Sequence, residues 1–179
     1  MIVLIVLGII LVLVLLWYVS TFNSIKVARL KVSEALSGID IALTKRFDTL
    51  TKMLDVVKGY QQHEITTLRE IVSLRKNMSM SERKDANAKM DQAMSQINVV
   101  AENYPELRSS ENFVTLQKSI ADVEEHLQAA RRLYNSNVTA YNAKIVMIPN
   151  SIVANQMGAT PAEFFEAEAP KREDVSMTF

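Results

Sequence analysis

The residues that most resemble a catalytic or metal-binding motif are His63 and Glu64, which match the start of the His-Glu-x-x-His helix motif of zinc proteases. That motif needs a second histidine one turn later, because both imidazoles must reach the metal from one face of the helix. The residue at that position is Thr67, and the other histidine, His126, is far along the chain. We therefore expect no metal site here, and a polar surface or capping role for His63.

The composition argues against several other classes of active site. The 179 residues contain no cysteine, which excludes disulfides, cysteine nucleophiles and thiolate metal sites. The 4 glycines are too far apart for a phosphate-binding loop, which places several within about eight residues. Because 20 Lys plus Arg balance 20 Asp plus Glu, the net charge of zero argues against nucleic-acid binding. We expect no enzymatic activity, no cofactor and no nucleic-acid partner.

A tyrosine–asparagine pair occurs twice, seven residues apart, as Tyr134–Asn135 and Tyr141–Asn142. On a helix this spacing places both tyrosines at one heptad position and both asparagines beside it. Polar groups at such positions can fix the register of packed helices, and a tyrosine ring is readily buried when its hydroxyl has a partner. We interpret these four residues as packing and register positions. A polar binding strip is the alternative interpretation.

The elements that position these groups begin with a hydrophobic segment, since residues 2–19 are all apolar or aromatic except Gly8. As a helix this segment is about 27 Å long, enough to span a bilayer. We assign residues 1–20 to a transmembrane helix. A cleaved signal peptide is the alternative, but no basic residue precedes the segment, and it exceeds the usual length of about 7–15 apolar residues. The anchor positions include Ile2, Leu7, Leu13, Leu16, Trp17 and Tyr18, the last two with rings suited to the headgroup level.

The basic residues Lys26, Arg29 and Lys31 follow the hydrophobic segment directly. By the positive-inside rule they place the bulk of the chain in the cytoplasm. The periplasmic or extracellular side is the alternative. Within the segment only one residue is small, so there is no Gly-x-x-x-Gly pair to drive helix dimerisation in the membrane.

The rest of the chain predicts an all-α fold, because apolar residues recur at helical spacing. No proline or glycine interrupts residues 9–37, so we expect the membrane helix to continue into the aqueous part, with a kink or break at Gly59. Further boundaries are expected near residue 80, at Pro105 and at Pro149. The first stripe has a heptad spacing broken once at Arg46 and comprises Val32, Leu36, Ile39, Leu43, Leu50, Met53 and Val57.

These segments must bury their apolar stripes against one another. We therefore predict an elongated antiparallel helical bundle or coiled coil over residues 21–158, continuing the transmembrane helix. An extended acidic and aromatic tail follows over residues 159–179, and its paired Phe164 and Phe165 suit docking on its own bundle. Docking on a neighbouring subunit is the alternative.

The last third of the chain carries the most specific sequence motifs. They include Arg132-Leu133-Tyr134-Asn135, Tyr141-Asn142, Ile148-Pro149-Asn150, Gly158 and Phe165-Glu166-Ala167. With these residues the chain resembles the LemA family of bacterial membrane proteins, and this resemblance implies a single-pass protein of the bacterial cell membrane with an all-helical body and no established catalytic activity. Leu36 and Thr51 depart from the family, which commonly has Trp and Pro at these positions, and the second change favours an unbroken helix.

We expect a membrane-anchored structural or scaffolding protein whose partners are the lipid bilayer and further copies of the same chain. The heptad stripes lie on helices too long for a compact bundle, which would leave apolar surface for a second chain. The alternative is a membrane adaptor that recruits a signalling or proteolytic partner through its coiled-coil surface.

Overall fold

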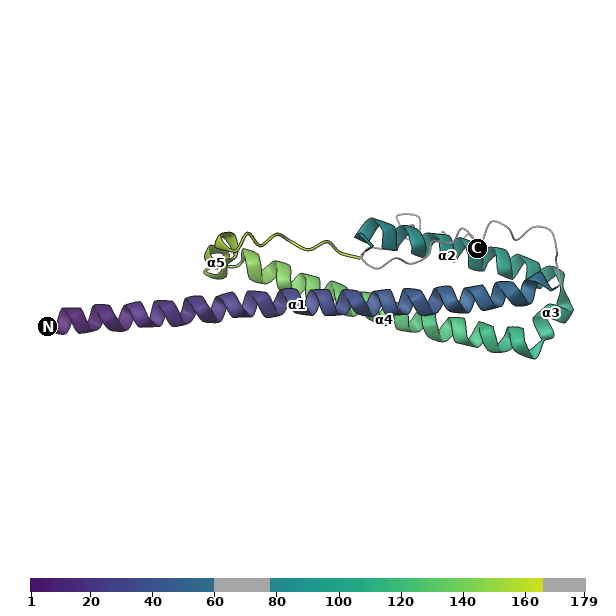
Figure 1. Ribbon diagram of the computed structural model, residues 1–179, viewed down its shortest axis with the longest axis horizontal. Helices are drawn as coiled ribbons and strands as arrows, with labels where there is room; N and C mark the ends of the chain where they lie inside the picture. Colours follow the sequence, from purple (N-terminus) through teal and green to yellow (C-terminus); the bar gives the residue numbers. More distant parts are fainter. Residues whose placement is uncertain (60–77, 166–179) are drawn as a thin grey trace, which may run out of the picture.

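The computed structural model describes residues 1–59 and 78–165, which form an elongated helical bundle with no β-strand among them (Figure 1). The all-α prediction is therefore confirmed. The predicted sites at His63 and in residues 166–179 lie outside the described residues. In chain order the helices are α1 (Ile2–Lys58), α2 (Met80–Asn103), α3 (Pro105–Ser109), α4 (Glu111–Val146) and α5 (Asn150–Gln156).

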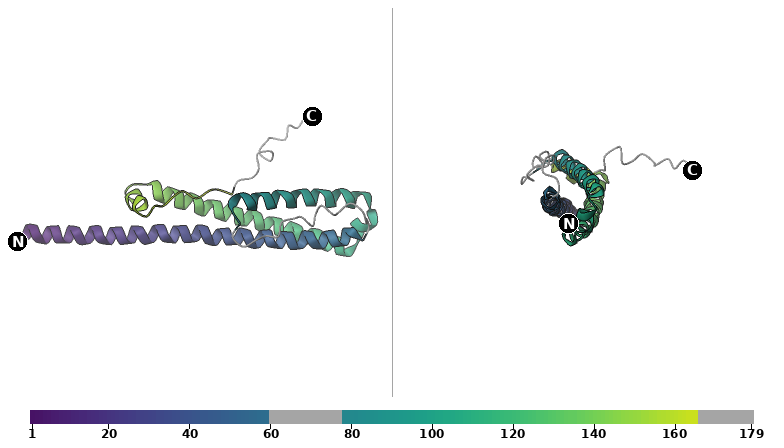
Figure 2. Two further views of the ribbon diagram at one scale, coloured as in Figure 1. Left: turned by 45° about the horizontal axis from the view of Figure 1, so that its top comes forward. Right: turned by 90° about the vertical axis from the view of Figure 1, so that its right-hand side faces the viewer.

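Helix α1 is continuous from the hydrophobic segment into the bundle, as the lack of interrupting residues predicts. Its 57 residues correspond to a length of about 86 Å. The helix ends at Lys58, one residue before Gly59. Figures 1 and 2 show its N-terminal part projecting alone beyond the other helices, so residues 2–16 of the hydrophobic segment are exposed and pack against no other described helix.

Helix α4 runs antiparallel to α1 over most of the length of the bundle, whereas α2 runs parallel to α1 (Figure 1). Near the base of the bundle, the Lys144 ammonium donates a hydrogen bond to Ser24 Oγ at 2.8 Å. Toward the middle, the Asn137 amide donates to the Lys31 carbonyl at 3.3 Å. Residue numbers therefore rise on α1 as they fall on α4.

The third side of the bundle is built from two different elements. Helix α2 covers the half that is far from the N-terminus, and α5 with residues 159–165 covers the other half (Figure 2). We call residues 159–165 the tail segment. This arrangement lets one long pair, α1 and α4, bury its apolar stripe along its whole length although no single third helix is long enough.

The heptad stripe of α1 forms the core. Ile39, Leu43 and Leu50 are fully buried, and Leu36 is half-buried. The opposing side chains include Phe113, Ile120, Leu127, Val138 and Ile145 on α4, with Met90 and Ile97 on α2. This heptad stripe, from which self-association was expected, is therefore buried inside the bundle. Any surface for self-association must lie elsewhere.

The helix boundaries follow local chemistry. The Ser79 hydroxyl accepts from the Glu82 amide while the Glu82 carboxylate accepts from the Ser79 amide, a capping box at the start of α2. The Ser110 hydroxyl caps α4 by accepting from the Phe113 amide. Helix α4 ends at Val146, three residues before Pro149, because proline disfavours helical backbone at the residue before it.

Candidate functional site

The Tyr–Asn strip, comprising Tyr134, Asn135, Tyr141 and Asn142, lies on α4 and faces the tail segment. Both tyrosine rings are buried in the core, and both asparagines are partly buried beside them. The seven-residue spacing keeps the two pairs on one face of α4, two turns apart. The four polar groups therefore point along one line toward the same extended segment.

Each asparagine binds both polar groups of one tail residue. The Asn142 amide donates to the Ala162 carbonyl at 3.0 Å, and its oxygen accepts from the Ala162 N–H at 2.8 Å. In the same way, Asn135 donates to the Phe165 carbonyl at 3.0 Å and accepts from the Phe165 N–H at 2.9 Å. A backbone that would otherwise lose its water on packing against α4 is thereby satisfied.

The tyrosines add a second row of hydrogen bonds to the same backbone. The Tyr141 hydroxyl donates to the Thr160 carbonyl at 3.1 Å, and the Tyr134 hydroxyl donates to the Glu163 carbonyl at 2.7 Å. All six bonds reach main-chain atoms of the tail, so they do not depend on which side chains the tail carries. The strip can therefore hold an extended peptide without reading its sequence.

The helix and the tail have matching repeats. One heptad of helix rises about 10.5 Å, and three residues of extended chain span about 10 Å. Moving seven residues along α4, from Asn142 to Asn135, moves the contact three residues along the tail, from Ala162 to Phe165. These hydrogen bonds are those of a polar binding strip, which was the alternative interpretation of the four residues. Their role in fixing the register of the helices stays a prediction.

The pKa of the Tyr134 phenol is raised above its ordinary value, chiefly because burial disfavours the phenolate. The nearby Arg83 guanidinium opposes this rise, and Glu163 adds to it. The folded protein therefore holds the phenol proton more tightly than the unfolded chain does. The resulting stabilisation is present below the unfolded pKa of about 10 and is lost as pH rises through the raised pKa.

A Tyr134→Phe variant is expected to be less stable than the wild type at pH 8, by about 1 kcal/mol, because it lacks the hydrogen bond to the Glu163 carbonyl. The difference should shrink as pH rises above about 10, because only the wild type loses a bound phenol proton. Thermal unfolding of both full-length proteins in detergent, from pH 8 to pH 11.5, measures this difference. A gap that stays constant across that range would contradict the assignment.

A layer of buried and half-buried polar groups crosses the bundle next to the strip. We call Arg46, Asn87, Asp91, Glu124 and Arg131 the arginine layer; they come from α1, α2 and α4. Arg46 is only 3% exposed, and its guanidinium donates to Asn87 Oδ1 at 2.6 Å and to Asp91 Oδ1 at 2.5 Å, while its Nε pairs with the Glu124 carboxylate. One arginine thus ties α1 to both of the other long helices.

Arg131 connects this layer to the tail. Its guanidinium donates to Asn87 Oδ1 at 2.6 Å and lies over the Phe165 ring, 4.8 Å from the centroid. Burial, followed by the nearby Arg46 charge, lowers the pKa of Arg131. Stacking on an aromatic face offsets part of the cost of desolvating a cation. The tail is therefore fixed by its backbone on the strip and by the Phe165 ring on Arg131.

A second ion pair fastens the start of α2. The Arg83 guanidinium, which is buried, binds the Asp40 carboxylate through two bonds of 2.6 and 2.8 Å. It also donates to the Met78 carbonyl. The hydrogen bond to Asp40 raises the pKa of Arg83. This bidentate geometry sets the register of α2 on α1.

The predicted anchor residues lie on the free part of α1. The side chains of Ile2, Leu7, Leu13 and Leu16 are exposed, whereas Trp17 and Tyr18 pack partly against the core. The basic residues Lys26, Arg29 and Lys31 are exposed where α1 enters the bundle. By length and composition this part of α1 could cross a membrane, and a signal sequence meets the same criteria.

The arginine layer was not expected from the sequence. The heptad pattern shows Arg46 only as a break in the stripe, and it does not mark Asn87, Glu124 or Arg131 as partners. A charged residue at an interior heptad position was nevertheless a usable signal, because burial of an arginine requires partners from other helices. Residues 160–165 of the tail bind α4 of their own bundle, whereas residues 166–179 lie outside the described part of the chain.

Comparison with known proteins matches most of the chain to one family. A model of the LemA family matches residues 35–179, a range that includes the strip, the arginine layer and the tail. A similar protein is Protein LemA of Metamycoplasma hominis, which is 27% identical over 163 residues. That alignment covers 88% of this chain and 74% of the other protein.

Proposed function

Because the chain belongs to the LemA family, we propose that it is a non-enzymatic, membrane-anchored helical protein that assembles with copies of itself into a scaffold. The exposed apolar N-terminal part of α1 supports the anchoring. The bundle supports a structural role, since its buried polar groups pair with one another and with the tail.

The observation that carries self-assembly is an apolar stripe on the outer face of α1. Val27, Leu30 and Ile41 are each more than half exposed, although they lie in the bundle-forming part of the helix. Val27 and Ile41 are two heptads apart, and Leu30 is three residues after Val27, so all three lie on one coiled-coil seam. The seam positions between Leu30 and Ile41 hold the polar residues Glu34 and Ser37. We call these residues the α1 stripe.

Anchoring in one membrane favours contacts between copies along this stripe. Anchored copies are parallel and share the same depth, so each residue of the stripe lies level with its counterpart on the next chain. Confinement to a membrane also raises the effective concentration of neighbours. A seam of moderate apolar area can then hold an assembly together that would be weak in solution.

The basic residues after the hydrophobic segment support a cytoplasmic location for the bundle. Lys26, Arg29 and Lys31 lie in the first turns beyond it, and the first acidic residue of the chain is Glu34. The positive-inside rule favours the cytoplasm for such a flank. The periplasmic or extracellular side is the alternative.

The proposal is tested by the mass of the full-length protein in detergent, measured by light scattering. We expect an oligomer for the wild type and a monomer for a Leu30→Glu/Ile41→Glu variant, because charges in the seam repel and resist burial. Leu133→Glu is the matched control, since Leu133 is equally apolar and exposed on α4 but lies off the stripe. The control should keep the wild-type mass.

A monomeric wild type in both detergent and membrane cross-linking would contradict self-assembly. The adaptor hypothesis would then take its place, with the α1 stripe as the surface for a different protein. Loss of the oligomer in the Leu133→Glu control as well would place the contact elsewhere on the bundle.

A further inference from the structure

The turn between α4 and α5, together with the adjoining ends of these helices, exposes a group of large apolar side chains. We call Val146, Met147, Ile148 and Ile152 the basal corner; each is more than half exposed, and Ile148 is 85% exposed. Single exposed apolar residues are ordinary on protein surfaces. Four within seven residues, on a turn where polar residues are the rule, indicate a surface that meets something apolar.

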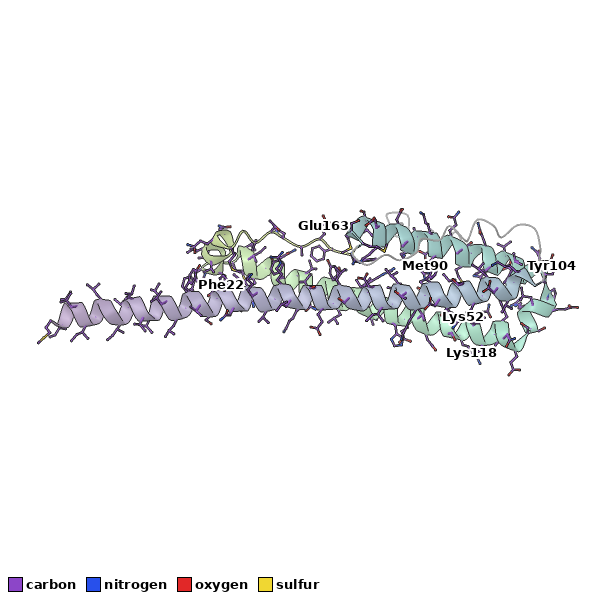
Figure 3. All side chains as sticks on the ribbon, in the orientation of Figure 1. Phe22, Lys52, Met90, Tyr104, Lys118 and Glu163 are labelled. Carbon is purple, nitrogen blue, oxygen red and sulfur yellow. The ribbon has the colours of Figure 1, made fainter. Side chains whose placement is uncertain are left out.

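The basal corner lies at the level where the hydrophobic segment of α1 joins the bundle. Lys144, two residues before the corner, binds Ser24 of α1 at 2.8 Å. Phe22 lies beside α5 (Figure 3). Trp17 and Tyr18, about one helical turn before Phe22, also pack partly against the core. The corner is therefore level with the aromatic end of the segment that spans the bilayer in the proposed function.

Among the described residues, the charge around the corner has one sign. Residues 1–33 and 135–162, which form this end of the bundle, include no Asp or Glu. Their four basic residues are Lys26, Arg29, Lys31 and Lys144. Basic residues around exposed apolar side chains are the pattern of surfaces that bind the anionic headgroups and outer acyl region of a bilayer.

We propose that the basal corner inserts into the surface of the same bilayer that α1 crosses, as a second lipid contact. The inference rests on the proposed membrane anchoring and adds a site to it. The four apolar side chains of the basal corner contact the region where the lipid headgroups meet the acyl chains. Lys144 and the basic residues of α1 contact the lipid phosphates. The bundle then stands on the membrane at two points rather than on one helix.

A fluorescent residue tests the depth of the corner, because Trp17 is the single tryptophan of the chain. Trp17→Phe/Val146→Trp protein is reconstituted into vesicles of phosphatidylcholine and phosphatidylglycerol with brominated acyl chains, which quench tryptophan on contact. We expect at least a twofold loss of emission relative to unbrominated vesicles. The matched control is Trp17→Phe/Leu133→Trp: Leu133 is 58% exposed against 65% for Val146, and lies about 20 Å further along α4. It should lose little emission.

The outcomes separate this inference from the anchoring itself. Native Trp17 reports on the anchor in the unmodified protein. Strong quenching of native Trp17 would support the anchor. If the tryptophans introduced at positions 146 and 133 were then quenched equally weakly, the corner contact would be overturned and the anchor would stand. No quenching of Trp17 would contradict the proposed function. A blue-shifted but unquenched Val146→Trp would also overturn the lipid contact, because protein would then cover the corner. Far-UV circular dichroism of each variant checks that the helices are intact.

Discussion

An Arg46→Ala variant is expected to lose about 3 kcal/mol of stability. The substitution removes the shared partner of Asn87, Asp91 and Glu124 and leaves a cavity between three helices. Breaking a buried ion pair costs about 3–5 kcal/mol when the remaining charge stays buried. The lower end applies here, because the Asp91 and Glu124 side chains are each about one-third exposed and can regain water.

Thermal unfolding of the full-length protein in detergent, followed by far-UV circular dichroism, measures this loss. A change of about 3 kcal/mol corresponds to a midpoint lower by about 6–12 °C for a protein of this size. Lys45→Ala is the control, since Lys45 is adjacent and exposed, and it should change stability by less than about 0.5 kcal/mol. Equal midpoints for the two variants would show that the arginine layer contributes nothing net.

Replacing both Asn135 and Asn142 with alanine is expected to release the tail segment from α4. Four hydrogen bonds to the tail backbone are lost. At about 0.7 kcal/mol each, within the usual range of about 0.5–1.5, the loss is about 3 kcal/mol. The amides of Ala162 and Phe165 should then exchange with solvent on the order of 100-fold faster.

Hydrogen exchange followed by NMR or mass spectrometry resolves this change. Asn137→Ala serves as the control, because Asn137 lies on the same helix but binds the Lys31 carbonyl rather than the tail. Its tail amides should exchange as in the wild type. Unchanged exchange in the double variant would mean that Phe165 and the tyrosines hold the tail without the asparagines. A changed mass of the assembled protein would instead support the role of these asparagines in helix register.

The helix boundaries could be predicted because each depends on residues close in sequence. Ser79, Pro105, Ser110 and Gly158 act within about four residues of their own position, through capping, a fixed backbone angle or a left-handed turn. Such signals survive without knowledge of the fold. The sequence pattern likewise identified the buried face of α1, since a heptad stripe is a property of one helix.

The arginine layer could not be predicted, because its contacts depend on how helices pair. Arg46 meets residues that are 41 to 78 positions away, and their identity as partners follows from the parallel placement of α2 and the antiparallel placement of α4. The strip is an intermediate case. The seven-residue repeat of the strip is visible in the sequence. Its binding partner, the backbone of the tail, could not be predicted, because it depends on the turn at α5 that directs the chain back along α4.

Because α1 is one continuous helix, a tilt of its N-terminal part displaces its far end. About 38 residues of this helix lie beyond the hydrophobic segment, a reach of about 57 Å. Because the helix has no hinge within its span, anchoring of α1 in a bilayer as proposed would couple its tilt to the whole bundle. A tilt of about 20°, ordinary for a transmembrane helix, would swing the far end near α3 sideways by about 20 Å. Small changes in bilayer thickness would thereby become large displacements at the distal tip.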